Sequence, residues 1–359
     1  MRPNQESGSD PASSRLMFSL TMILAIVVSP FTVLCMSDME TPRGRKRGRM
    51  DFRELVEPYH RELRAHCYRM LGSLPDAEDA LQETLLAAWQ GLDGFEERSS
   101  VRTWLYRIAT NRCLNLRRSA ARRPPAAWDV PAVDPIPPTR LGEITWLTPF
   151  PTTPEDGYER REDISLAFVT ALQALPPRQV AVLLLRDVLD FPAGEVAAML
   201  DTTTDSVKSA LKRARAGLSH LSSEPAAASP AEAEILARFV RAWEAADIAA
   251  LVELLTDDVF ITMPPIPFEY VGRDLVARFC AALFAAGRRF DLTPSQANGQ
   301  PAYVARLHDS GAPAGLYVLT LRGPRISALT RFDATVLRSF GAKSLSEGED
   351  RAALGAQVA

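Results

Sequence analysis

Apolar residues recur every three or four positions over much of the chain from residue 51 onward, which predicts amphipathic helices. The first stripe includes Leu55, Tyr59, Leu63 and Cys67, and a Gly-Ser-Leu-Pro turn at residues 72–75 ends it. A second helix begins near Asp76, which we expect to act as its N-cap, and continues to residue 91. Similar stripes predict helices over residues 101–121, 164–175, 180–188, 191–200 and 205–218.

The pattern changes after residue 230. Two helices, over residues 235–246 and 251–255, precede short runs that are typical of strands. These runs cover residues 259–263, 303–307, 316–321 and 326–332, with one more helix over residues 273–286. This order predicts an α+β domain with helices on one face of a curved antiparallel sheet.

Proline divides the helical part in two. Residues 124–158 hold nine prolines, so neither a continuous helix nor a central strand is expected there, and we predict an extended linker. Within it, the sequence Trp-Leu-Thr-Pro-Phe-Pro at residues 146–151 is too apolar for a simple spacer, and we expect it to dock on another surface. A second linker, Glu-Pro-Ala-Ala-Ala-Ser-Pro, occupies residues 224–230.

Charge is strongly segregated although the whole chain of 359 residues has a net charge of only −3. Residues 51–97 carry eleven acidic and four basic side chains, whereas residues 98–123 carry eight arginines and no acid. Arginines interleaved with Trp104, Tyr106 and Asn111 can attract phosphates and also stack on or hydrogen-bond to bases. We therefore expect nucleic acid to be the partner of this basic helix, rather than reading it as a solvated charged face.

Residues 16–36 are uncharged and long enough to span a bilayer, and basic residues follow at once. Three interpretations are open: translation that starts at Met36, Met39 or Met50, a membrane anchor, or a signal peptide. The first two leave the fold beyond residue 50 unchanged. The four cysteines are scattered without a CxxC pair, so we expect neither a zinc site nor a disulfide framework.

Residues 191–218 fit a helix-turn-helix, in which two short helices flank a tight turn and the second helix presents hydroxyls and cations. Any helical hairpin can give this pattern. A plain helix-turn-helix repressor that never touches polymerase therefore stays open at this point. A third alternative is an enzyme of the C-terminal fold with a DNA-binding appendage.

Two motifs nevertheless resemble one family. The run DAEDALQETLLAAW at residues 76–89, followed by RTWLYRIATNR at residues 102–112, is similar to region 2 of extracytoplasmic-function (ECF) sigma-70 factors. Residues 175–186 (LPPRQVAVLLLR) through 207–215 (VKSALKRAR) resemble region 4, and residues 231–342 resemble a SnoaL-like cone. This resemblance implies a multidomain chain with two all-α sigma domains followed by an α+β cone.

We expect the following organisation. It comprises an N-terminal extension at residues 1–49, region 2 at 50–123, the Pro-rich linker at 124–158, region 4 at 159–222, a linker at 223–230, the SnoaL-like domain at 231–342 and a tail at 343–359.

The resemblance also implies roles for individual residues. The acidic second helix would dock on the β′ clamp helices of RNA polymerase core through Asp76, Asp79, Gln82 and Glu83. The basic third helix and the loop before it would hold the melted −10 element, with Asn111 as a base reader, through Phe95, Arg102, Trp104, Arg107, Asn111, Arg112 and Arg117. The helix-turn-helix would contact the −35 element through Ser206, Lys208, Ser209, Lys212, Arg213 and Arg215.

The predicted function is promoter-specific transcription initiation, modulated by the C-terminal domain. We expect no catalytic residue, cofactor or metal, and a cytoplasmic location; a membrane enters only if residues 16–36 are translated and inserted. A small-molecule ligand or regulatory protein at the C-terminal domain is a further expected partner. Apolar and polar candidates for lining a pocket there, which are more simply read as ordinary core, are Trp243, Phe260, Met263, Phe268, Tyr270, Phe279, Phe284, Tyr303, Asp258 and Arg331.

Overall fold

The computed structural model describes residues 52–340, except for residues 96–98, 121–124, 129, 131–132, 153–163 and 219–229. The apolar stretch at residues 16–36 and the tail at 343–359 lie outside the described residues. Within the described part, no helix is both long enough and apolar enough to cross a bilayer.

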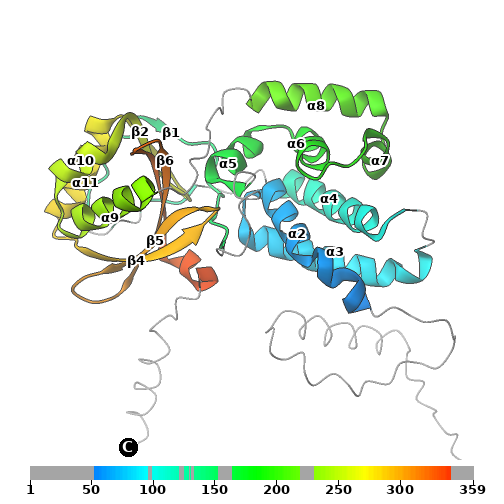
Figure 1. The fold of residues 1–359 in the computed structure, drawn as a ribbon, viewed down its shortest axis with the longest axis horizontal. Coiled ribbons are helices and arrows are strands. Elements are labelled where there is room, and N and C mark those ends of the chain that lie inside the picture. The colour runs from blue at the N-terminus through cyan, green and yellow to red at the C-terminus, as the bar shows by residue number, and fades with distance from the viewer. Residues whose placement is uncertain are drawn as a thin grey trace, which may run out of the picture. The chain divides into compact units, whose positions relative to one another are not determined.

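Three helices form the first helical group: α2 (Phe52–Leu71), α3 (Leu74–Gly91) and α4 (Val101–Ala120), with a 3₁₀ turn η2 (Leu92–Gly94) after α3 (Figure 1). The N-cap of α3 is Ser73, whose Oγ accepts a hydrogen bond from the Asp76 amide at 3.4 Å. The expectation that Asp76 caps this helix is therefore wrong. Its carboxylate lies in the first turn, where it still complements the helix dipole.

Gly72 lies in the turn between α2 and α3 and faces Gln173 of the second helical group. Its φ is +71°, and a Cβ atom there would lie 2.9 Å from side-chain carbons of Gln173, so both conformation and space favour glycine. Gln173 donates from Nε2 to the Arg69 carbonyl at 3.1 Å. This close approach places the first helix of the second group against the end of α2.

The second helical group contains α5 (Leu166–Ala174), α6 (Pro177–Leu183), the π-helical turn η6 (Leu184–Val188), α7 (Ala193–Met199) and α8 (Thr204–Leu218). Asp201 takes a left-handed conformation between α7 and α8 (φ 49°). α8 buries Val207 and Ala214 and leaves most of its other side chains exposed. The predicted helix-turn-helix is present within residues 193–218 of the structure.

The C-terminal domain begins with α9 (Pro230–Glu244) and α10 (Ile248–Leu254). Strands β2 (Leu255–Met263) and β3 (Ile266–Val271) precede α11 (Arg273–Ala285), and β4 (Phe290–Ala297), β5 (Gln300–Leu307), β6 (Pro313–Arg322), β7 (Arg325–Phe332) and the 3₁₀ helix η7 (Ala334–Phe340) follow. With β1 (Arg140–Leu141) contributed by the Pro-rich linker, the strand order is β1-β3-β2-β7-β6-β5-β4, and the three α-helices cover one face (Figure 1). The sheet is antiparallel as expected except where β2 and β7 run parallel.

Strands β3 and β4 escaped prediction because each contains a proline and β4 also contains several polar residues, which weaken the strand pattern. The unbroken apolar run in β6 has a different cause: the sheet is covered on both faces. Tyr317 and Leu319 pack with the helices, whereas Leu316 and Val318 belong to the same apolar cluster as the two helical groups.

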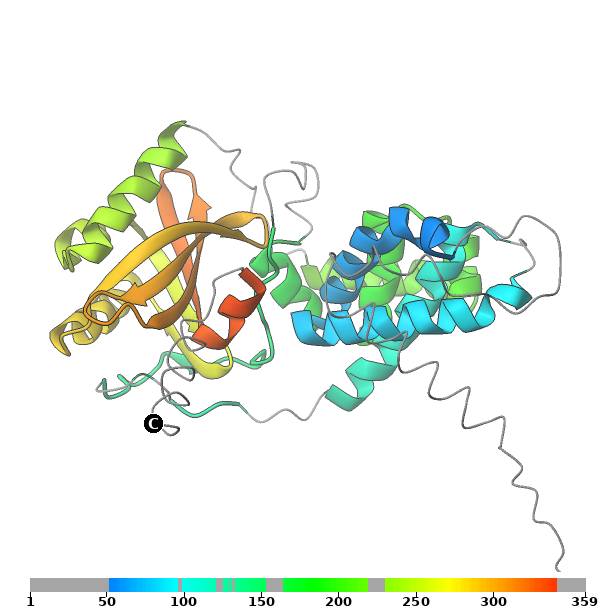
Figure 2. The same cartoon turned by 90° about the horizontal axis from the view of Figure 1, so that it is seen from below.

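The Pro-rich linker is more structured than its composition predicts. Residues Arg140–Leu141 form strand β1, which pairs antiparallel with β3. The described part of the linker runs along the surface of the C-terminal domain (Figure 2). Leu147 and Phe150 of the apolar segment are buried, while Trp146 is half-buried. The short β1 is an edge strand, which tolerates nearby prolines because only one side is paired.

Candidate polymerase and promoter surfaces

An acidic, exposed face runs along α3. Asp79, Gln82 and Glu83 are exposed, while Ala80, Leu81 and Thr84 between them pack into the core. Asp76 is half-buried at the start of the same helix. Trp89 continues the face, and its side chain is 43% exposed, which is unusual for a residue of this size.

A groove of about 410 Å³ lies between α3 and α4. Its floor and walls combine apolar, amide and cationic groups, contributed by Ala87, Trp104, Arg107, Ile108, Asn111, Arg112 and Asn115. Phe95 stacks on Trp104 with ring centroids 4.7 Å apart. Five of the seven residues predicted to meet the −10 element therefore gather at or beside this groove: Phe95, Trp104, Arg107, Asn111 and Arg112.

The other two predicted −10 residues have partners in the second helical group. The Arg102 guanidinium lies 4.3 Å from the Phe191 ring centre and donates to the Leu189 carbonyl at 3.1 Å. Arg117 donates to the carbonyls of Met70, Gln173 and Leu175 at 3.1–3.3 Å, and its partial burial lowers the pKa of the guanidinium to about 10. In this structure both arginines join the two groups instead of facing solvent.

Further contacts connect α4 to α7. Thr103 Oγ1 donates to the Glu195 carboxylate at 2.8 Å, and Asn111 Nδ2 donates to the Met199 carbonyl at 3.4 Å. The amide of Asn111 is thus shared between the groove and the second group. The arrangement is closed, since the second group covers part of the helix predicted to read DNA.

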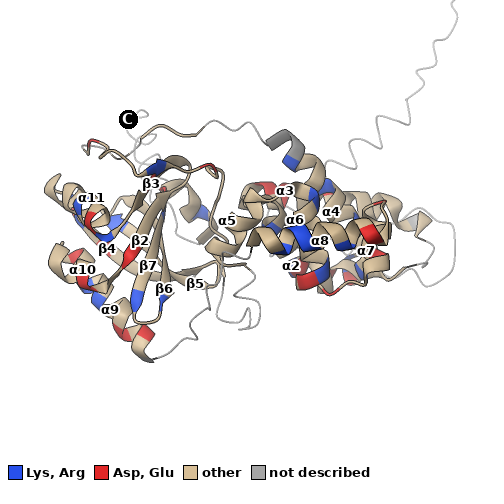
Figure 3. Ribbon diagram, turned by 90° about the horizontal axis from the view of Figure 1, so that it is seen from above, with Lys and Arg blue, Asp and Glu red and all other residues tan. Residues whose placement is uncertain are grey.

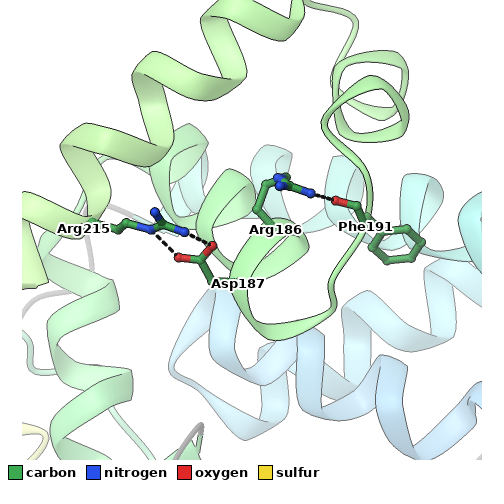
Figure 4. Close-up of polar contacts among 4 residues, drawn as sticks. All are labelled: Arg186, Asp187, Phe191 and Arg215. Carbon is green, nitrogen blue, oxygen red and sulfur yellow. Dashed lines mark hydrogen bonds and ion pairs between the residues drawn. The ribbon is translucent and has the colours of Figure 1, made fainter.

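The cationic face of α8 is exposed, and Figure 3 shows blue segments along this helix. All six residues predicted to contact the −35 element are exposed: Ser206, Lys208, Ser209, Lys212, Arg213 and Arg215. They differ in their partners. Arg215 makes a two-bond ion pair with Asp187 at 2.7 and 2.8 Å, and this carboxylate raises the pKa of Arg215 (Figure 4).

Figure 4 also shows Arg186, the residue before Asp187, donating to the Phe191 carbonyl. The two neighbouring side chains thus hold opposite sides of the helix-turn-helix. Asp187 fixes α8, and Arg186 fixes the segment before α7. Sequence reasoning missed both residues because neither falls in the helix-turn-helix itself.

The C-terminal domain reaches the helical groups through Asn298, a fully buried residue in the β4–β5 turn with φ 55°. Its Nδ2 donates to Tyr68 Oη at 2.8 Å and to the Ile164 carbonyl at 2.7 Å. Its Oδ1 accepts a hydrogen bond from the Phe150 backbone amide at 2.8 Å, and its own backbone amide donates to the Phe150 carbonyl at 2.8 Å. One side chain therefore ties together α2, the linker and the segment that precedes α5.

His66 is a buried titratable group in the first helical group. Its Nε2 lies 2.9 Å from Thr110 Oγ1, and desolvation lowers the pKa of its imidazole to about 3, with a smaller contribution from Arg69. Within the described residues, Nδ1 has no hydrogen-bond partner. The neutral ring joins α2 to α4 as part of the core.

The residues proposed from the sequence as pocket-lining groups mostly form core. Among the aromatic ones, Trp243, Tyr270, Phe279, Phe284 and Tyr303 are buried. Met263 is also buried, while Phe260 and Phe268 are half-buried. Asp258 is exposed and pairs with Arg322 at 2.7 Å, so its carboxylate does not line an interior pocket. No group of three potential metal ligands occurs in the described part of the chain.

Comparisons with known proteins identify the family of the chain. Three family models match: sigma-70 region 2 over residues 55–123, sigma-70 region 4 over 165–218, and a SnoaL-like domain over 236–333. The ECF RNA polymerase sigma factor SigG of Mycobacterium tuberculosis is 43% identical, with 86% of this chain and 88% of that protein aligned. The chain belongs to the ECF RNA polymerase sigma factor family.

A second relative also matches most of the chain. The sigma factor SigJ of Mycobacterium tuberculosis is 29% identical over 78% of this chain and 88% of its own length. The crystal structure of SigJ matches with a TM-score of 0.55 at 22% identity, covering 79% of this sigma factor and 98% of that chain. This match shows that the fold of the C-terminal domain after the sigma regions is shared.

Family membership decides between the alternatives left open by the sequence. This protein is a sigma factor that acts with RNA polymerase core in promoter-specific initiation, not a free-standing helix-turn-helix repressor. It is a transcription regulator. The α2–α4 group is region 2, and the α5–α8 group is region 4.

Proposed function

We propose that this sigma factor binds polymerase core through the exposed face of α3, holds the −10 element in the groove between α3 and α4, and reads the −35 element with α8. The observation that carries this proposal is the division of charge. The acidic exposed face of α3 differs in charge from the cationic surfaces of α4 and α8, as a protein with one protein partner and one nucleic-acid partner requires. The faces of α3 and α4 meet at the exposed ion pair between Glu83 and Arg112, at 3.8 Å.

On α3, Asp79, Gln82 and Glu83 offer polar groups to the β′ clamp helices of the core enzyme, with Asp76 at the end of the same face. Trp89 adds an apolar anchor, since an exposed tryptophan gains more than other residues from burial in an interface. Charge pairs at such a rim set orientation and association rate more than affinity.

The α3–α4 groove suits an unstacked base. Asn111 presents an amide that can pair two edge atoms of a base, and Arg107 and Arg112 on its two sides supply charge for the backbone. The stacked Phe95–Trp104 pair offers an aromatic surface next to them. Arg102 and Arg117 contribute to DNA binding only after they leave region 4.

On α8, Lys208, Lys212 and Arg213 are placed for phosphates and base edges in the major groove, with Ser206 and Ser209 as hydroxyl partners. Arg215 remains paired with Asp187 and orients the helix. Its contribution to DNA affinity is therefore smaller than that of Arg213.

The C-terminal domain modulates this activity by stabilising the closed arrangement. Asn298 bonds to region 2, to the linker and to the segment before region 4 at once, so the three parts are held by one turn. A small molecule or a regulatory protein that binds the C-terminal domain would shift the balance between closed and open forms. The proposed site of action is the cytoplasm, where polymerase and promoters meet.

The test is run-off transcription with polymerase core on promoters isolated by chromatin mapping. The double variant Asp79→Lys/Glu83→Lys should lose most co-purification with core and most transcript, while promoter-duplex binding by α8 persists. A single exposed pair contributes only ~0–1 kcal/mol, so the double change is needed. Glu234→Lys/Asp274→Lys on α9 and α11 is the charge-matched control. Unchanged core binding by the α3 variant would contradict the assignment.

A further inference from the structure

The described residues of the Pro-rich linker between Ala126 and Gly142 (126–128, 130 and 133–142) lie against β3 and α11 of the C-terminal domain. Trp128 is the largest group in this contact. Its ring stacks on Phe268 with centroids 5.7 Å apart and meets the edge of Phe279 at 6.5 Å. Nearby, Val130 and Val133 are buried in the same apolar cluster. None of this contact involves the Trp-Leu-Thr-Pro-Phe-Pro segment at residues 146–151.

The linker also pairs with the edge of the sheet through its backbone. The amides of Thr139 and Gly142 donate to the carbonyls of Glu269 and Pro267 at 2.9 and 2.6 Å. In return, the Val271 amide donates to Thr139 Oγ1 at 2.9 Å. Without β1, β3 would be the edge strand of the sheet, with these groups unpaired.

We propose that the face of β3 and α11 is a binding surface for this linker, with Trp128 as its anchor, and that it stores the linker while regions 2 and 4 are closed. The mode is strand addition to a sheet edge combined with an aromatic pocket for one side chain. The occupant is a segment of this same chain, the described linker residues 126–128, 130 and 133–142.

Chain length gives the physical reason for a regulatory effect. Five residues, 121–125, separate the end of α4 from Ala126, whose amide bonds to the Pro265 carbonyl. At 3.3–3.6 Å per residue they can span at most ~20 Å. Released from end to end, the 43 residues between Ala120 and Ile164 could span ~150 Å. A bound linker therefore limits how far region 2 can move from the C-terminal domain.

The contact is also of a kind that can be released. β1 has only two residues, Trp128 is half-buried, and the Arg140–Glu269 ion pair has an exposed arginine. Exposed pairs and short edge strands add little stability. Trp128 brings the largest apolar side chain to this contact, which makes it the residue to change.

The first experiment measures amide hydrogen exchange by mass spectrometry in the full chain. Trp128→Ala should raise exchange at least tenfold in peptides covering residues 125–142 and 266–272, the latter including the Val271 amide. Trp128→Phe should restore part of the protection, because a phenyl ring can still stack on Phe268. Leu141→Ala is the matched control, since Leu141 lies in the same segment with its side chain 62% exposed.

Equal exchange in Trp128→Ala and Leu141→Ala would overturn the proposal. So would protection of residues 266–272 that rises with protein concentration, because the occupant would then be a second copy of the chain. An unchanged melting temperature of the C-terminal domain in Trp128→Ala shows that any gain in exchange is local; a loss of its cooperative melting would mean that Trp128 is a core residue and would also overturn the proposal.

The consequence for transcription rests on the proposed function, whereas the exchange measurement does not. With core polymerase, Trp128→Ala should give two- to fivefold more transcript than the wild type at limiting sigma concentration, and Leu141→Ala should not. Faster exchange with unchanged transcription would support the binding surface for the linker but overturn its regulatory role. Absence of transcription from every variant and from the wild type would instead count against the proposed function.

Discussion

Single residues in region 2 divide between proposed DNA contacts and internal contacts, and their residue types do not reveal which is which. Asn111 and Arg117 are six positions apart on α4, and both were predicted to contact the −10 element. Asn111 is exposed in the groove, whereas Arg117 is half-buried and bonds to three carbonyls. The two residues should therefore respond differently to truncation.

Asn111→Ala should lower the free energy of unfolding by no more than ~1 kcal/mol, because it removes one long hydrogen bond to the Met199 carbonyl. It should lower promoter opening, with relaxed preference at one −10 position worth ~1–3 kcal/mol. Arg117→Ala should instead lower the free energy of unfolding by about 2–3 kcal/mol, because carbonyls at the ends of α2 and α5 lose a charged donor. Opening assays on a −10 library and urea unfolding measure the two effects. If the Asn111→Ala protein opened the promoters of the −10 library in the same order of preference as the wild type, Asn111 would not be a base reader.

His66 gives region 2 a defined pH dependence. Its pKa is about 3 in the folded protein and 6.5 when unfolded, so the unfolded state binds the proton first as the pH falls. The stabilisation is complete above pH 6.5 and is lost progressively toward pH 3. Between pH 7 and pH 5 it should fall by about 2 kcal/mol. Urea midpoints should show a shallower pH dependence in His66→Gln than in the wild type.

At the scale of one element, two arginines of α8 differ in their ion-pair partners and therefore in their expected contribution to DNA binding. Arg213 and Arg215 are both exposed on the recognition helix, yet only Arg215 is paired with Asp187. Arg213→Ala should weaken duplex binding and reduce the salt slope by about one counterion. Arg215→Ala should change the slope less, since its charge is already balanced by Asp187. Titrations at several salt concentrations measure both slopes, and equal slopes would contradict the distinction.

At the scale of the whole molecule, the β4–β5 turn holds the closed arrangement. Asn298→Gly keeps the left-handed turn but removes the side-chain bonds to Tyr68, Ile164 and Phe150. We expect it to raise transcription from a cognate promoter several-fold, and truncation after Leu221 to exceed that effect if the sigma regions stay folded. Ser310→Gly in the β5–β6 turn is the control. Equal transcript from all four proteins would deny the C-terminal domain a role in regulation.

The apolar segment of the linker at residues 146–151 also depends on the packing of the whole molecule. The sequence predicts that residues 146–151 dock, and Trp146 is the conspicuous side chain. In the structure, Leu147 and Phe150 carry the burial, and Arg64 lies 5.0 Å from the Phe150 ring centre. A burial pattern of this kind depends on which face of an irregular segment meets its neighbour, and no periodicity in the sequence encodes that.

Much of the molecule follows from the sequence alone. Helical periodicity, the prolines at residues 124–158 and the charge division between residues 51–97 and 98–123 determine the helical groups and their partner classes, because each is a local property of the chain. Only the tertiary structure decided which arginines face solvent, that Asn298 joins three segments, and that Trp128 anchors the linker. Those contacts join residues up to 230 positions apart, and their partners are chosen by packing and burial.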